Sequence, residues 1–354
     1  MKIADSHVHA RCNVELTTKL LDDMFSVGVT DACLLALTYN GVAQNLFTLY
    51  MKEKYKKVNL RAFGGFHVTD RYCTVTPEVQ AKTVIDLGAD GFKIMFSPDM
   101  QKFYGRGIDD GYYDKLFTYL EDNQIPVNVH LADPETFWDN GGNYQDGTFP
   151  SKELMLNQAF NRLHKNPNLK ITFAHFLFLS NQPDLAELVM EKYPLVRFDL
   201  TPGMEMYFNF DNNLQFWHDF FIKYQDRLLF GTDCNTVKTC NKELVQLVKR
   251  KLTEDYAPYV QNCYNQDLTM RGLNLPSDVV NKICFDNYFD YLGKTPKAID
   301  KDLFKWVGNR ILNDLSQNPY DPYYEKGGQL IKHLQKDPTQ QISIDFINYA
   351  LKTI

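Results

Sequence analysis

Two histidines stand two residues apart near the start of the chain, in the segment Asp5-Ser-His7-Val-His9. Alternate residues of an extended strand project from one face, with Cα atoms about 6–7 Å apart, so both imidazoles can reach a single metal ion. Asp5 shares that face. The segment fits a metal clamp at the end of a strand, and it equally fits two hydrogen-bonded structural histidines. The pair alone does not decide between these two interpretations.

Three later apolar segments also end on a residue that can bind a metal. Residues 125–130 end at His130, residues 169–175 end at His175, and residues 227–233 end at Asp233. Each has the pattern of a short buried strand with its polar residue near the C-terminal end. A buried His or Asp costs several kcal/mol unless it is paired or coordinated. Four such strand ends in one chain therefore indicate a shared metal site.

The elements that must position these residues alternate along the chain. Short β-type runs are expected near residues 2–9, 31–37, 60–68, 91–96, 126–131, 170–176, 196–201 and 228–233. Amphipathic helices are expected near residues 17–27, 43–57, 76–87, 112–123, 152–164, 184–192 and 211–224. Repeated βα units of this kind predict an α/β fold, and eight of them favour a (β/α)8 TIM barrel. No Gly-x-Gly-x-x-Gly follows the first strand to indicate dinucleotide binding. The candidate ligands then lie at the C-terminal ends of barrel strands, where reacting groups sit in this fold.

The rest of the chain is expected to surround this barrel. The long segment 133–150 is rich in turn-forming residues, and we favour a lid over the site. From about residue 240 the pattern becomes helical. We expect a barrel domain over residues 1–293 and a helical C-terminal extension over 294–354. The extension either packs on the barrel or takes part in an oligomer interface.

Composition limits the partners of the protein. The 354 residues carry a formal net charge of −6, without a basic stripe, which argues against nucleic-acid binding and favours a small-molecule substrate. The seven cysteines form an odd set without a Cys-x-x-Cys pair and are expected to be reduced thiols. The chain shows neither a signal-peptide pattern nor an apolar run of about 18 residues that could span a membrane. We therefore expect a cytoplasmic protein, and homo-oligomerisation is left open.

In chain order, the motifs resemble those of the amidohydrolase superfamily, and more closely its amidohydrolase-2 branch. They are Asp5-Ser-His-Val-His9, Gly91-Phe-Lys-Ile94, Pro126-Val-Asn-Val-His130, Ala174-His175 and Phe230-Gly-Thr-Asp233. That branch includes metal-dependent hydrolases and aminocarboxymuconate-semialdehyde-type decarboxylases. The resemblance covers roughly residues 1–293.

The resemblance implies that His7, His9, His130 and Asp233 bind one divalent ion, with His175 beside it as a catalytic residue. Neutral imidazoles and a carboxylate suit Zn²⁺, and Mn²⁺ or Fe²⁺ are alternatives because ligand type seldom fixes the metal. Asp233 would be both ligand and proton acceptor.

The favoured reaction is hydrolysis of an amide, ester or lactone bond by metal-activated water. The alternative is non-oxidative decarboxylation of a small aromatic or unsaturated carboxylic acid at the same ion. A third reading is a barrel that binds metal without turnover. The ligands are common to the first two reactions and do not separate them.

Three further residues are candidates for substrate binding. Lys93 occupies the position where some relatives carry a carboxylated lysine between two ions, but anion binding or a buried ion pair is favoured here. Arg106 could hold a substrate carboxylate through a bidentate contact, or it could be a solvated loop residue. His67, near the end of the third expected strand, could reach the site or serve as a structural histidine.

Overall fold

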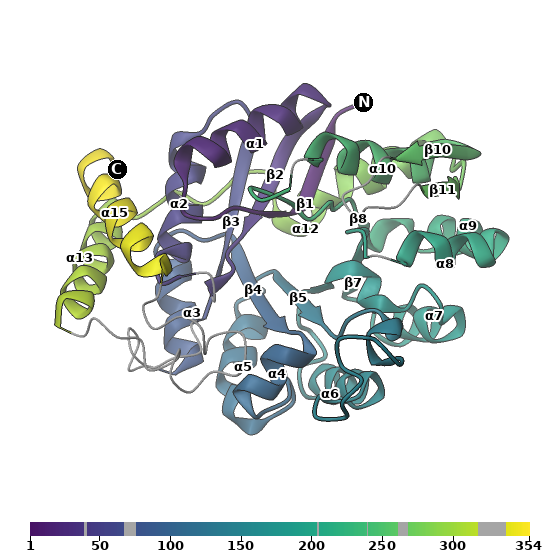
Figure 1. Cartoon of the computed structure of the whole chain (residues 1–354), viewed down its shortest axis with the longest axis horizontal. Helices are drawn as coiled ribbons and strands as arrows, with labels where there is room; N and C mark the ends of the chain where they lie inside the picture. Colours follow the sequence, from purple (N-terminus) through teal and green to yellow (C-terminus); the bar gives the residue numbers. More distant parts are fainter. Residues whose placement is uncertain (39–40, 67–75, 204, 239, 261–267, 318–337) are drawn as a thin grey trace.

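Parallel strands form the centre of the molecule (Figure 1). The computed structural model describes residues 1–354 except 39–40, 67–75, 204, 239, 261–267 and 318–337. Its parallel strands are β1 (Ile3–His9), β2 (Val29–Leu35), β3 (Asn59–Gly65), β4 (Gly91–Phe96), β5 (Val127–Leu131), β6 (Ile171–Phe173), β7 (Val196–Asp199), β8 (Leu228–Leu229) and β9 (Cys234–Asn235). Their order in the sheet is β8-β7-β6-β5-β4-β3-β2-β1-β9.

The last strand closes the sheet into a barrel. β8 pairs with β7 and β9 pairs with β1, yet both belong to one stretch of chain, residues 228–235. Between them, Ser6 N donates to Phe230 O at 2.9 Å and Asp233 N donates to His7 O at 2.9 Å. The stretch is thus an interrupted eighth strand, and the predicted TIM barrel is confirmed. The interruption, which the sequence pattern did not indicate, falls beside Asp233.

Helices follow the strands and cover the outside of the barrel. They are α1 (Val14–Ser26), α2 (Gln44–Lys54), α3 (Pro77–Asp86), α4 (Pro98–Tyr104), α5 (Asp114–Asp122), α6 (Lys152–Lys165), α7 (Pro183–Lys192), α8 (Met206–Asn212), α9 (Leu214–Lys223) and α10 (Asn241–Thr253). Local sequence sets several of their starts. The side chains of Asn13 and Ser151 accept hydrogen bonds from backbone N–H groups in the first turns of α1 and α6. The helix expected near 211–224 divides into α8 and α9 at Asn213.

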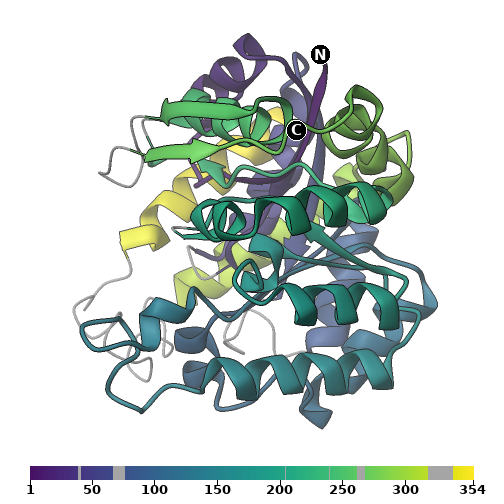
Figure 2. The ribbon, with the colours of Figure 1, turned by 90° about the vertical axis from the view of Figure 1, so that its right-hand side faces the viewer.

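The expectation that the chain is helical after residue 240 is wrong for one segment. β10 (Tyr256–Val260) and β11 (Leu268–Arg271) form an antiparallel hairpin next to α10, drawn in green in Figure 2. Both runs contain β-branched or aromatic residue types, which suit strands better than helices. Lys251, on α10, donates from Nζ to Arg271 O at 2.7 Å and so ties the hairpin to the barrel. The chain then continues through α11 (Ser277–Asn281) and α12 (Asn287–Leu292).

The last helices, α13 (Lys301–Gln317) and α15 (Pro338–Thr353), lie against the outer side of the barrel near α2 (Figure 1). The ring of Phe346 meets that of Phe47 at a centroid distance of 5.0 Å, and Tyr50 OH lies 3.0 Å from Thr353 Oγ1. The segment before α13 is also attached, since Asp300 N donates to Leu87 O at 3.2 Å. No helix in the described part of the chain is both long and apolar enough to cross a membrane.

The cysteines differ from expectation at one position. Cys12, Cys33, Cys234 and Cys284 are buried free thiols. Cys240 is disulfide-bonded, so the expectation that every cysteine is reduced is wrong for this residue. Spacing along the chain does not show which thiols the fold brings together. Cys73 and Cys263 lie outside the described residues.

Candidate metal centre

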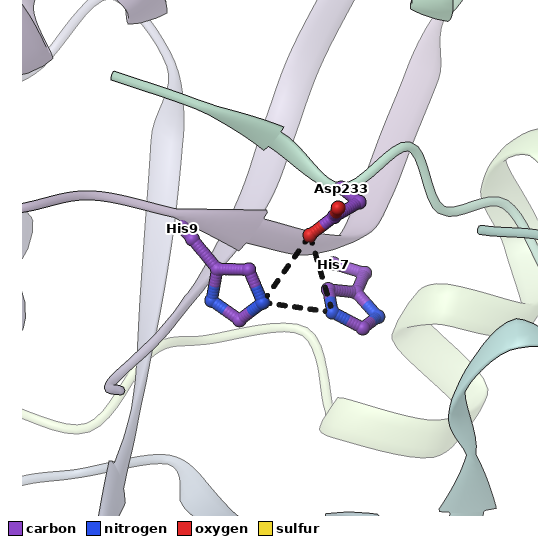
Figure 3. A group of neighbouring side chains, drawn as sticks. All are labelled: His7, His9 and Asp233. Carbon is purple, nitrogen blue, oxygen red and sulfur yellow. Dashed lines mark hydrogen bonds and ion pairs between the residues drawn. The ribbon is translucent and has the colours of Figure 1, made fainter. Parts of the chain in front are cut away.

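The structure brings together His7, His9 and Asp233 (Figure 3). Both histidines project from β1, and Asp233 lies in the gap between β8 and β9. The Nε2 atoms of His7 and His9 are 3.0 Å apart. Asp233 Oδ1 lies 3.4 Å from His9 Nε2 and 3.9 Å from His7 Nε2. Three atoms able to bind a metal therefore point at one small volume.

The backbone of Asp233 turns its carboxylate toward β1. Its φ of 56° lies in the left-handed region, which costs a non-glycine residue free energy and is common at functional sites. The turn is held by the hydrogen bond from Asp233 N to His7 O. Lys238 holds the other side of the residue, because its Nζ donates to Asp233 O at 3.0 Å and to Oδ2 at 2.8 Å. Oδ1 is left to face the histidines.

The outer ring nitrogens of the two histidines fix where their protons lie. His9 Nδ1 is 2.9 Å from Leu35 O, and His7 Nδ1 is 2.9 Å from Asp199 Oδ2. A carbonyl or carboxylate oxygen accepts, so each Nδ1 carries the hydrogen of a neutral imidazole. Burial also lowers the pKa of His9 to about 4 and holds that of His7 well below its usual value. Both Nε2 atoms are then unprotonated and face each other across 3.0 Å beside a carboxylate.

Asp199, at the end of β7, holds His7 and neighbouring residues in place through hydrogen bonds. Its Oδ2 accepts from His7 Nδ1 and, at 3.1 Å, from Asn128 Nδ2. Its Oδ1 accepts from the backbone N–H groups of His175 at 2.9 Å and Thr201 at 3.2 Å. The residue is fully buried. Asp199 was not among the predicted site residues, and the signal in the sequence was an acidic residue between Phe198 and Leu200.

His130 and His175 lie beside the cluster. Their rings are 4.8 Å apart between centroids, and the His175 ring is 5.4 Å from that of His7. His130 Nε2 is 3.3 Å from Asp133 Oδ1. His175 has a left-handed backbone with φ of 53°, and its buried Nδ1 has no hydrogen-bond partner among the described residues. Burial, followed by the neighbouring His130, holds the pKa of His175 well below its usual value, so this imidazole is neutral.

A cavity of about 300 Å³ opens next to these side chains. It is lined by His9, Ala10, Arg11, Leu37, Met95, His130, His175, Asp233, Asn235, Thr236 and Val237. Four residues predicted from strand ends thus share one cavity. Arg11, Asn235 and Thr236 were not predicted. They enter the wall because β9 pairs with the end of β1, a contact between distant parts of the chain.

The predicted substrate-binding residues occupy other places. Lys93 is buried on β4 with its Nζ 2.6 Å from Asn128 Oδ1, and burial lowers its pKa to about 8. It is not among the residues that line the cavity. Arg106 follows α4, is exposed, and places its guanidinium 4.6 Å from the ring of Tyr112 rather than in the cavity. His67 lies outside the described residues.

The loop predicted to be a lid is tied to His130. Asp133 accepts from Tyr144 OH at 2.5 Å through Oδ2, while its Oδ1 faces His130 Nε2. Trp138 Nε1 donates to Pro150 O at 3.1 Å, which ties the interior of the loop to its C-terminal end. A carboxylate that holds one nitrogen of a ligating histidine is a common feature of metal sites. The loop thus contacts the candidate centre through Asp133.

A family model and several solved structures are similar to this chain. The amidohydrolase family model matches residues 16–287, which begins after His7 and His9. A comparison with curated proteins found no match. Among solved structures, 2,6-dihydroxybenzoate decarboxylase from Rhizobium is similar with a TM-score of 0.52 and 13% identity, over 82% of this chain and 99% of that one.

Two further structures are similar at lower scores. A dihydroxybenzoic acid decarboxylase from Polaromonas, with bound manganese, has a TM-score of 0.49 and 13% identity, covering 82% of this chain and 97% of that one. A phosphotriesterase homology protein from Escherichia coli has a TM-score of 0.47 and 11% identity, covering 82% and 99%. The likeness to the Rhizobium enzyme, at 13% identity and a TM-score of 0.52, indicates a shared fold alone. The family match, in contrast, spans most of the chain and confirms the predicted resemblance: the chain belongs to the amidohydrolase family.

Proposed function

We propose that this protein is a metal-dependent hydrolase that cleaves an amide, ester or lactone bond of a small molecule. One observation carries the proposal. His7 Nε2, His9 Nε2 and Asp233 Oδ1 face one another, and the hydrogen bonds at the two Nδ1 atoms leave no proton between them. Buried lone pairs at these distances repel unless a cation lies among them. The donor set, two imidazole nitrogens and a carboxylate oxygen, fits a divalent ion.

His7, His9 and Asp233 would hold this ion, with His130 as the fourth ligand. His130 gives its Nε2 to Asp133, so Nδ1 is the nitrogen left for a metal. We propose Zn²⁺, with Mn²⁺ and Fe²⁺ as alternatives. When bound, such an ion polarises a carbonyl group and lowers the pKa of water to near neutrality.

The surrounding residues supply the other requirements of hydrolysis. Asp233 would accept the proton of the attacking water and return it to the leaving group, as a general acid–base residue does. His175, neutral and unpartnered at Nδ1, would stabilise the negative charge that develops on the carbonyl oxygen or orient the water. The cavity of about 300 Å³ matches a small organic substrate.

A specific contact favours a second candidate function, non-oxidative decarboxylation of a small aromatic or unsaturated carboxylic acid. Lys238 occupies Oδ2 of Asp233, the oxygen that points away from the histidines. Burial acts to raise the pKa of Asp233, but the neighbouring ammonium group of Lys238 opposes it, and the pKa lies below its ordinary range. A carboxylate stabilised in this way is a weak base. Decarboxylation needs no proton acceptor for water, because carbon dioxide leaves and a proton takes its place on carbon.

One set of assays separates these functions. Purified protein saturated with Zn²⁺, Mn²⁺ or Fe²⁺ would be analysed for metal and tested against esters, lactones, amides and aromatic or unsaturated acids, with release of carbon dioxide monitored. We expect one ion per chain and hydrolytic turnover that is lost in Asp233→Asn. Carbon dioxide release without hydrolysis would replace our proposal with the second candidate. Two ions per chain with a modified Lys93 would refute the mononuclear site, and metal binding without turnover would refute both reactions.

A further inference from the structure

We propose that Arg11 recognises the substrate in this cavity and selects a molecule that carries a carboxylate group beside an apolar body. The inference deepens the proposed function and rests on it, because it takes the cavity beside His9 and Asp233 as the place where substrate binds. It assigns recognition to a residue that precedes α1, outside the segment matched by the family model.

The pairing of the first and last strands places Arg11 in the cavity wall. Val8 is in register with Cys234 and His9 with Asn235. Two residues beyond His9, the backbone N–H of Arg11 donates to Thr236 Oγ1 at 3.2 Å. The position of Arg11 is therefore set by the same two chain segments that carry His9 and Asp233, and Arg11 lines the cavity with these two residues.

Among the described residues, Arg11 is the cation of this cavity wall without a partner of its own. In the part of the chain that the structure describes, its guanidinium makes no hydrogen bond, ion pair or ring contact. Lys238 is paired with Asp233, which lines the cavity. Lys93 bonds to Asn128 and does not line the cavity. A guanidinium presents parallel N–H groups that match both oxygens of a carboxylate.

The other residues of the cavity wall indicate the polarity of the rest of the ligand. Ala10, Leu37, Met95 and Val237 are apolar, and Asn235 and Thr236 are uncharged. Asp233 is the single carboxylate among the lining residues, and Lys238 neutralises it. An anionic ligand thus meets one free positive charge and no uncompensated negative one. An apolar body between its carboxylate and its reacting group would contact the four apolar side chains.

Benzoate and its uncharged analogue benzamide test this inference by titration calorimetry. They have the same size and differ in the group that Arg11 would bind. Arg11→Gln removes the charge, and Arg106→Gln is the matched control, because Arg106 is also exposed but contacts Tyr112 outside the cavity. Each protein is titrated both metal-free and with Zn²⁺ bound, since a metal ion can bind benzoate directly. Metal content and melting temperature are measured on the same preparations to show that each variant is folded.

We expect wild-type protein to bind benzoate at least tenfold more tightly than benzamide. Arg11→Gln should weaken benzoate binding by about 10–100-fold, the range of a hydrogen bond to a charged group, and leave benzamide binding within about twofold. Arg106→Gln should change neither. Equal benzoate affinity in wild type and Arg11→Gln, or no preference for benzoate over benzamide, would overturn the inference. Failure of the proposed function is seen separately, as absent metal or absent hydrolysis, and leaves the comparison in metal-free protein intact.

Discussion

Asp199 provides a test of how the candidate metal centre is built. Its carboxylate accepts four hydrogen bonds, from His7 Nδ1, Asn128 Nδ2 and the backbone N–H groups of His175 and Thr201. Asp199→Asn keeps the shape of the side chain but replaces one accepting oxygen with a donating NH₂ group. On one of the two sides, the new NH₂ group therefore faces groups that themselves donate hydrogen bonds.

Both orientations of the introduced amide carry a cost. If the NH₂ group faces His7, the imidazole must move its hydrogen to Nε2, and that nitrogen can no longer bind a metal. If the NH₂ group faces His175 and Thr201, two buried backbone N–H groups lose their acceptor. We expect metal affinity to fall about 10–100-fold, as for other residues that orient ligating histidines. The free energy of unfolding should fall by about 1–3 kcal/mol.

The assay is competition with a chelator for Zn²⁺, combined with urea unfolding of the metal-free protein. Asp90→Asn is the matched control. Asp90 is also buried and accepts from Lys52 Nζ at 2.7 Å, Ala62 N at 2.9 Å and Lys297 N at 2.7 Å, but it contacts none of the candidate ligands. The control should lose stability and keep its metal affinity. If Asp199→Asn binds Zn²⁺ as tightly as wild type, Asp199 does not set the protonation of His7, and the argument for the site fails.

Four further substitutions test the separate roles of other residues. Asp233→Asn should lower turnover about 10²–10⁴-fold, more than it lowers metal content, because the proton acceptor is lost while histidines still hold the ion; near-normal turnover would exclude Asp233 as the base. His130→Ala should lose metal, whereas His175→Ala should keep it and lose activity, as measured on the same preparations; equal metal loss would make His175 a ligand. Lys93→Met tests a buried amine whose pKa of about 8 lies below the 10.5 of an ordinary lysine. Between these two pH values the unfolded state binds more protons than the folded state, so the stability of wild type rises with pH. In urea unfolding, wild type should gain about 2 kcal/mol of stability relative to the variant from pH 7.5 to 9.5. A difference in unfolding free energy that stays constant with pH would refute the depressed pKa.

The parts of the site that were predictable are those that depend on one strand at a time. His7 and His9 share a face because alternate residues of a strand do, and His130, His175 and Asp233 stand out because each ends an apolar run. The barrel follows from counting such runs. Strand bounds differ by a few residues, as β6 (Ile171–Phe173) shows, because the turn after it begins at a left-handed residue, His175.

The unpredicted parts depend on contacts between strands. Asp199 acts through His7, which lies on a strand far away in sequence, and no local pattern indicates which imidazole a buried carboxylate will reach. Arg11 and Lys238 enter the site because the last strand breaks and rejoins the first. Arg106, in contrast, had a suitable residue type in a suitable loop, but α4 leaves it beside Tyr112. Residue type indicates which side chains could bind a substrate or metal, but the pairing of the first and last strands decides which of them lie at the site.

The break in the eighth strand has a consequence for how the protein is made. His7 belongs to the first barrel strand to be synthesised, but Asp233 belongs to the last, and the hydrogen bond from Asp233 N to His7 O forms when these strands meet. A contact between such distant residues requires a large loss of chain entropy and forms late in folding. The complete ligand set therefore exists only in a chain whose barrel has closed. Chains that end before Asp233 would offer a metal the histidines of β1 and β5 without the carboxylate, so tight metal uptake would mark the end of folding.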